Sequence, residues 1–207
     1  MKKLIKICGI TSIEDADFCL KNDVDILGFN LYKNSKRFIG FDQVLEIIED
    51  IKISFQSTLV FVNEDKGFVS ECLREIPNAI PQFHGDESAE YCESFGQDFI
   101  KAIRVNKDSS LPKIFNQYSS ATMMLLDSFS QKEYGGTGLS FDWDLINKDL
   151  TNDYLLAGGL NPESLKEAIK RVGPIGYDLN SGVELSPGLK NKMKIKECVD
   201  LIRGTDD

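Results

Sequence analysis

The sequence has very little histidine and no long apolar run, and both absences narrow what the protein can be. His84 is the only histidine, so a metal site built from three histidines is excluded. No apolar run approaches the roughly 18 residues that a transmembrane helix needs. The start of the chain carries two lysines followed by an apolar run too short for a signal peptide. We therefore expect a cytoplasmic protein without a membrane partner.

Cysteine is present, but not in the patterns that disulfides or zinc require. The number of cysteines is odd, their spacing is irregular, and no Cys-x-x-Cys pair occurs. Neither a disulfide framework nor a cysteine-rich zinc site is indicated. Unpaired thiols are typical of a reducing compartment. The residues concerned are Cys8, Cys19, Cys72, Cys92 and Cys198.

Positively charged side chains are fewer than negatively charged ones. The chain has 24 Lys and Arg against 33 Asp and Glu, a net charge of −9. This balance argues against nucleic acid or an anionic membrane as a partner. A small anionic substrate is compatible with it, because a pocket needs only local positive potential. The 207 residues suit one domain, residues 1–207.

The sequence does contain a regular alternation of short apolar runs and stretches of helical period. Residues 41–51, for example, place Val44, Ile47, Ile48 and Ile51 on one stripe. About eight such repeats in about 200 residues predict a parallel sheet with helical crossovers. We expect an α/β fold, a single-domain (β/α)8 TIM barrel, with a doubly wound open sheet as the alternative. The expected strands are residues 4–9, 26–31, 58–63, 80–85, 99–105, 122–127, 154–159 and 175–180.

Polar side chains recur where these strands end. In a (β/α)8 barrel the active site lies at the carboxyl-terminal ends of the strands. Cys8, His84 and Asp127 end the first, fourth and sixth strands, and Arg37 follows the second. We expect them to meet at one face of the barrel. His84 is expected to orient its neighbours rather than to react itself.

Strand alternation adds a second layer of polar residues beneath the first. Lys6 shares a face with Cys8, and a neighbouring ammonium is expected to lower the pKa of that thiol. Gln82 shares a face with His84 by the same rule. The residues that we expect to contribute to substrate binding are Lys6, Arg37, Gln82, His84 and Asp178.

Two glycine-containing segments follow the seventh and eighth strands. Gly158 and Gly159 precede a helix, and Asn180, Ser181 and Gly182 follow the last strand. Loops at these two positions bind phosphate through backbone N–H groups in many barrels. Glycine lets the backbone approach the anion closely. We therefore expect these five residues to bind phosphate.

Taken in order, several segments resemble the phosphoribosylanthranilate isomerase family of tryptophan biosynthesis. They are "KICGIT", "GFNLYKNSKRFI", "QFHGDE", "LLDS", "YGGTGLSFDW", "LLAGGLNPE" and "YDLNSGVELSPGLKN", which run from residue 6 to about residue 190. The resemblance implies a (β/α)8 barrel that uses no metal and no organic cofactor. It implies the Amadori rearrangement of N-(5-phosphoribosyl)anthranilate to 1-(2-carboxyphenylamino)-1-deoxy-D-ribulose 5-phosphate, the third step of tryptophan synthesis from chorismate.

The resemblance also implies roles for single residues. Cys8 matches the general base of the family, and Asp127 matches its general acid. Arg37 matches the arginine that receives the anthranilate carboxylate. One departure is Lys36, which stands where family members often have proline. The "YGGTG" segment, residues 134–138, is expected either to form a lid over the substrate or to be a plain loop.

Other functions stay open at this point. One alternative is another sugar-phosphate isomerase or epimerase on a phosphate-binding barrel. The related isomerase of histidine biosynthesis usually has aspartate at the position of Cys8, which argues against it. A ribulose-phosphate epimerase would need several metal-binding histidines, and this sequence has one. A second alternative is a barrel that binds but has lost catalysis. We expect a small-molecule substrate and either a monomer or a homodimer.

Overall fold

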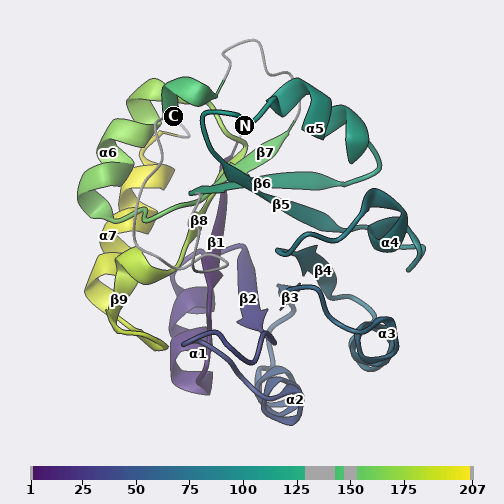
Figure 1. The fold of residues 1–207 in the computed structure, drawn as a ribbon. Coiled ribbons are helices and arrows are strands. Elements are labelled where there is room, and N and C mark those ends of the chain that lie inside the picture. The colour runs from purple at the N-terminus through teal and green to yellow at the C-terminus, as the bar shows by residue number, and fades with distance from the viewer. Residues whose placement is uncertain (1, 129–142, 147–152, 206–207) are drawn as a thin grey trace.

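Eight parallel strands close into a barrel in chain order, as the computed structural model shows (Figure 1). The structure describes residues 2–128, 143–146 and 153–205. Pairing of the first strand with the last closes the ring and rules out the open sheet. The strands are β1 (Leu4–Cys8), β2 (Ile26–Asn30), β3 (Gln56–Phe61), β4 (Ile80–Phe83), β5 (Ile100–Val105), β6 (Met123–Ser128), β7 (Tyr154–Leu156) and β8 (Gly176–Leu179).

Helices surround the barrel and follow one another around it (Figure 1). A small antiparallel hairpin, β9 with β10, follows the last barrel strand. None of the helices in the described part of the chain is long and apolar enough to span a bilayer. The helices and hairpin strands are α1 (Ile13–Lys21), α2 (Phe41–Asp50), α3 (Lys66–Glu75), α4 (Ala89–Glu93), α5 (Leu111–Gln117), the 3₁₀ turn η1 (Trp143–Leu145), α6 (Pro162–Arg171), the 3₁₀ turn η2 (Ser181–Val183), β9 (Glu184–Ser186), β10 (Leu189–Lys190) and α7 (Lys192–Arg203).

The alternation along each strand divides the apolar residues between two cores. Ile5 and Ile7 of β1 face outward and join the large cluster between barrel and helices. Leu125 of β6 and Leu155 of β7 belong to a smaller cluster that fills the barrel interior. Polar side chains of β1 therefore share the inward face with Leu4, which packs on that inner cluster. The inner core ends below the carboxyl-terminal ends of the strands, where the polar side chains begin.

The sequence did not predict every element. The one-turn helix α4 was missed because five residues are too few to show a helical period. The β9–β10 hairpin was not predicted, because strands of three and two residues are too short to show an alternation of apolar and polar residues. Helix α7 was not predicted either. Strand β7 ends at Leu156 rather than at residue 159, because Gly158 and Gly159 adopt φ of +91° and +63°. Residues 134–138 lie outside the described residues.

Candidate active site

A pocket opens at the carboxyl-terminal ends of the barrel strands. Most of the residues that the sequence placed at this face line it. Two fully buried predicted residues, Lys6 and Gln82, do not line it but lie beneath residues that do. Gly182 also lies outside the lining. The lining consists of the predicted Cys8, Arg37, His84, Asp127, Gly158, Gly159, Asp178, Asn180 and Ser181, together with Asn30, Ser35, Val60, Val62 and Ala157.

Lys6 links the two pocket residues at the β1–β8 side. Lys6 and Asp178 are direct neighbours across the β1–β8 ladder, and the Lys6 Nζ lies 2.9 Å from Asp178 Oδ1. Burial disfavours the ammonium, but Asp178 and Cys8 outweigh it and raise the pKa of Lys6. Gly28 of β2 makes room for this group. A Cβ at Gly28 would lie 2.9 Å from Cys8 Sγ and 3.0 Å from Lys6 Nζ.

The pKa of the Cys8 thiol is raised, so the prediction of a lowered value is wrong. Burial is the largest cause, because the thiolate loses its hydration. The ammonium groups of Lys6 and Lys190 act in the opposite direction without overcoming it. The carboxylate of Asp178 adds to the rise. The surroundings of Cys8 therefore favour the protonated thiol over the thiolate.

His84 connects β4 to Asp127 on the other side of the pocket. The His84 Nε2 lies 3.2 Å from Asp127 Oδ2, although the two atoms are not aligned as a hydrogen bond. The other ring nitrogen, Nδ1, lies 3.1 Å from Nε2 of the buried Gln82. If the amide of Gln82 donates to Nδ1, the proton of the neutral ring sits on Nε2 and faces Asp127. These two contacts are compatible with the predicted orienting role of His84, which stays a prediction.

Arg37 reaches the pocket from the loop after β2 and is held by a carboxylate that the sequence analysis missed. The Arg37 Nη2 lies 2.7 Å from Glu184 Oε2, and Lys190 Nζ lies 2.8 Å from Glu184 Oε1. Burial opposes ionisation of Glu184, but Arg37 and Lys190 outweigh it and lower its pKa. Lys190 also donates to Asn180 Oδ1 at 3.0 Å. Arg37 and Lys190 thus share the Glu184 carboxylate, and a second carboxylate, that of Asp15, accepts from the backbone N–H of Lys190 at 3.2 Å.

The predicted phosphate loops come together at the same mouth. Gly158 and Gly159 lie beside Ser181 in the lining, so the loops after β7 and β8 face one space. Gly182 allows the two loops to approach each other closely, since a Cβ at this position would lie 2.0 Å from the carbonyl oxygen of Leu160. Both glycines adopt backbone conformations in the left-handed region, which other residues rarely adopt. The arrangement is suited to an anion.

Two groups of polar residues in or beside the pocket were not predicted from the sequence. Asn30 ends β2 and Ser35 precedes Arg37, so their positions at a strand end and in the loop were available signals. Glu184 and Lys190 lie on the hairpin, which was not predicted. Within the described ranges, no group of three or more His, Cys, Asp or Glu side chains is arranged to hold a metal ion.

Comparison with known proteins identifies the family. A family model described as N-(5'phosphoribosyl)anthranilate (PRA) isomerase matches residues 5–201. The chain is 38% identical over 200 residues to N-(5'-phosphoribosyl)anthranilate isomerase of Legionella pneumophila (strain Paris), covering 97% of each chain.

Two solved structures agree with this assignment. Phosphoribosyl anthranilate isomerase of Thermotoga maritima superimposes with a TM-score of 0.88 at 33% identity, covering 99% of this chain and 100% of that one. A phosphoribosyl anthranilate isomerase in complex with reduced 1-(o-carboxyphenylamino)-1-deoxyribulose 5-phosphate gives a TM-score of 0.82 at 31% identity, with the same coverage. The chain belongs to the N-(5'-phosphoribosyl)anthranilate isomerase family.

Proposed function

We propose that this pocket isomerises N-(5-phosphoribosyl)anthranilate with Cys8 as the general base and Asp127 as the general acid. As a member of its family, the protein is an aldose–ketose isomerase of tryptophan biosynthesis. The observation that carries the proposal is that Cys8 and Asp127 line one pocket from β1 and β6. These strands are not neighbours in the barrel, so the two side chains reach the pocket from different sides.

Each residue has one proton to move. Asp127 donates a proton to the ring oxygen of the ribose, which opens the ring and leaves a Schiff base to anthranilate. Cys8 then removes the proton from carbon two of the sugar, which leaves an enolamine. The enol O–H at carbon two loses its proton to water and carbon one gains a proton from water, which gives the ketone. Protons are exchanged and no electron acceptor is needed, because the oxidation of one carbon is matched by the reduction of its neighbour.

The raised pKa of Cys8 sets a condition on this chemistry. A protonated thiol cannot accept a proton, so the thiolate has to form before the second step. Lys6 lies beside Cys8 and favours its thiolate, although burial has the larger effect on the pKa of Cys8. The minor thiolate form therefore carries the reaction.

The rest of the pocket matches the two anionic ends of this substrate. The loops containing Gly158, Gly159 and Ser181 are suited to the phosphate, because their backbone faces the pocket. Arg37 is suited to the anthranilate carboxylate, since a guanidinium binds carboxylates in a fixed planar geometry. Arg37 places a cation in the pocket lining of a chain whose net charge is −9.

The setting of the reaction is part of the same proposal. The five cysteines are free and buried, which supports a reducing cytoplasm as the place of action. The substrate is a small molecule, and neither nucleic acid nor membrane is required. A monomer or a homodimer is compatible with a pocket that this chain lines by itself.

The test is turnover of phosphoribosylanthranilate that is generated in situ and followed by its fluorescence. We expect rapid loss of the signal with the wild type and a loss of activity of about 100-fold or more in Cys8→Ala and in Asp127→Asn. A wild type that leaves this substrate unchanged but converts the histidine-pathway aminoaldose would contradict the proposal. A fully active Cys8→Ala variant would leave the reaction in place and remove Cys8 from it.

A further inference from the structure

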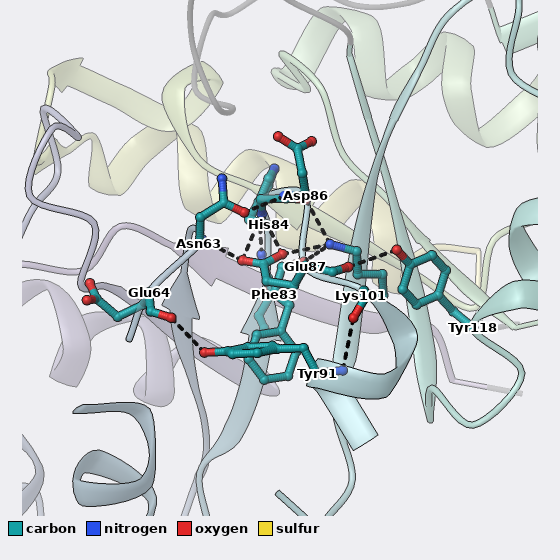
Figure 2. A network of polar contacts seen from close by, with 12 residues as sticks. Asn63, Glu64, Phe83, His84, Asp86, Glu87, Tyr91, Lys101 and Tyr118 are labelled. Atoms are coloured by element: carbon teal, nitrogen blue, oxygen red, sulfur yellow. Dashed lines mark hydrogen bonds and ion pairs between the residues drawn. The ribbon is translucent and has the colours of Figure 1, made fainter. Parts of the chain in front are cut away.

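A buried ion pair lies beside the pocket and has no place in the proposed chemistry. The Lys101 Nζ lies 2.8 Å from Glu87 Oε2, and both side chains are 2% exposed. Lys101 faces outward from β5, and Glu87 lies in the loop between β4 and α4. Figure 2 shows Glu87 between Asn63 and Lys101, with Tyr118 on the far side of the lysine.

The Glu87 carboxylate accepts hydrogen bonds from two segments and from the lysine. Oε1 accepts from the backbone N–H of Asn63 at 2.7 Å and of Gly85 at 3.2 Å. Oε2 accepts from the Gly85 N–H at 2.9 Å in addition to the ammonium of Lys101. The carboxylate thus ties the segment after β3 to the segment after β4.

Lys101 holds the same segment from the opposite direction. Its Nζ donates to the carbonyl oxygen of Gly85 at 2.8 Å and to that of Phe83 at 3.4 Å. The residue between these two is His84, whose own N–H donates to Phe61 O at 2.8 Å. The backbone on both sides of His84 is therefore fixed by one ion pair (Figure 2).

Stability alone does not explain the pair. Replacing a buried ion pair with apolar residues of similar size is often neutral or stabilising, because desolvation offsets the attraction. Glu87 lies in the loop after the carboxyl-terminal end of β4, at the face of a (β/α)8 barrel where catalytic side chains lie, and Lys101 reaches it from the second position of β5. The backbone that the pair fixes flanks His84, whose Nε2 lies 3.2 Å from Asp127 Oδ2.

We propose that the Glu87–Lys101 ion pair is a positioning device that holds His84 against Asp127. This inference rests on the proposed role of Asp127 as the general acid. Glu87 and Lys101 do not line the pocket themselves, so they act through the backbone of residues 83–85. Displacing that backbone moves the imidazole from Asp127 and slows the chemical step, with little effect on how the substrate is held.

The decisive variant is Glu87→Gln. An amide offers one oxygen to donors that now share two, so its NH₂ group must face either the ammonium or a backbone N–H. A shift of about 1 Å in a catalytic group can slow a reaction by about 100-fold, so we expect kcat to fall by about 10- to 100-fold. We expect KM to change by less than about threefold, because the phosphate loops and Arg37 are untouched.

A second readout does not depend on activity. His84 is the only histidine, so the Cε1–Hε1 NMR signal of the imidazole in the untagged protein reports on this residue alone. We expect the signal to shift in Glu87→Gln. The matched control is Asp25→Asn at the other end of the barrel, where Asp25 Oδ2 accepts from the backbone N–H of Ile5 and from Arg203. That variant is expected to lower stability while kcat and the His84 signal stay as in the wild type.

The outcomes separate the inference from the proposed function. A folded Glu87→Gln variant with wild-type kcat and an unmoved His84 signal would overturn the inference. If the variant fails to fold, the doubly apolar Glu87→Leu/Lys101→Met variant decides, because it leaves no buried charge unpaired. A folded double variant with reduced kcat supports the positioning role, and one with wild-type kcat overturns it. A wild type without turnover contradicts the proposed function, while the NMR comparison still tests the positioning.

Discussion

Replacing Gly182 with alanine tests the phosphate site through a clash that the structure defines. A Cβ at residue 182 would lie 2.0 Å from the carbonyl oxygen of Leu160 and 2.6 Å from its carbonyl carbon. It would also lie 3.0 Å from Asn161 Cβ. Ordinary contact begins at 3.4 Å, so the loops after β7 and β8 must separate by about 1.4 Å (3.4 less 2.0). The obstacle is backbone, which cannot rotate away as a side chain would.

The size of the effect follows from that displacement. Forcing extra volume into a well-packed site costs about 1–3 kcal/mol, and a backbone obstacle places Gly182→Ala near the upper end. The loops that separate are those proposed to bind phosphate, so we expect KM to rise by about tenfold or more. The expected change in kcat is smaller, because Cys8 and Asp127 lie on strands that the clash does not reach.

The assay combines urea unfolding with steady-state kinetics on the same preparation. The matched control is Gly173→Ala, where an added Cβ has nothing within 4 Å. We expect that control to keep the wild-type KM. A folded Gly182→Ala variant with the wild-type KM would refute the reasoning, since the two loops would then not need their present spacing to hold the substrate.

Three further predictions concern the charged groups around the pocket. Because burial raises the pKa of Cys8, iodoacetamide should label it with an apparent pKa above about 8.5; an apparent pKa below about 8.5 would contradict this. Lys6→Met removes the cation beside the thiol and leaves Asp178 buried without it, so we expect a lower unfolding midpoint in urea and slower alkylation of Cys8; alkylation at the wild-type rate would show that Lys6 does not favour the thiolate. The lowered pKa of Glu184 means that its ionisation stabilises the fold above the unfolded value of about 4.3 and that this contribution is lost as pH falls through the folded value. Between pH 6 and pH 3 the urea midpoint of the wild type should therefore fall further than that of Glu184→Gln, and parallel curves would refute this.

The barrel and the main pocket residues could be predicted because both follow from local rules. Alternation along β1 placed Lys6 beneath Cys8, and the register of β1 with β8 explains why Lys6 meets Asp178. The family resemblance added chemistry that alternation cannot supply. The positions of the apolar runs were enough to predict that Asp127 and Gly158 lie near strand ends.

The predictions from sequence failed where a pKa depends on opposing effects or where a contact joins residues far apart in the chain. The pKa of Cys8 was predicted from the neighbouring lysine alone, whereas burial has the stronger influence and Asp178 shares the same ammonium. The pairing of Glu87 with Lys101 joins a loop to an outward-facing strand position, and no sequence period marks it. Glu184 was missed because its short hairpin has no pattern of its own.

The central claim is that Cys8 and Asp127 serve successive steps on one bound substrate. The most direct test is the single-turnover rate of the Cys8→Ala/Asp127→Asn double variant against both single variants. Because the slower of two successive steps sets the rate, we expect the double variant to be about as slow as the slower single variant. A loss equal to the product of the two single losses, or a single variant that turns over at the wild-type rate, would contradict the account.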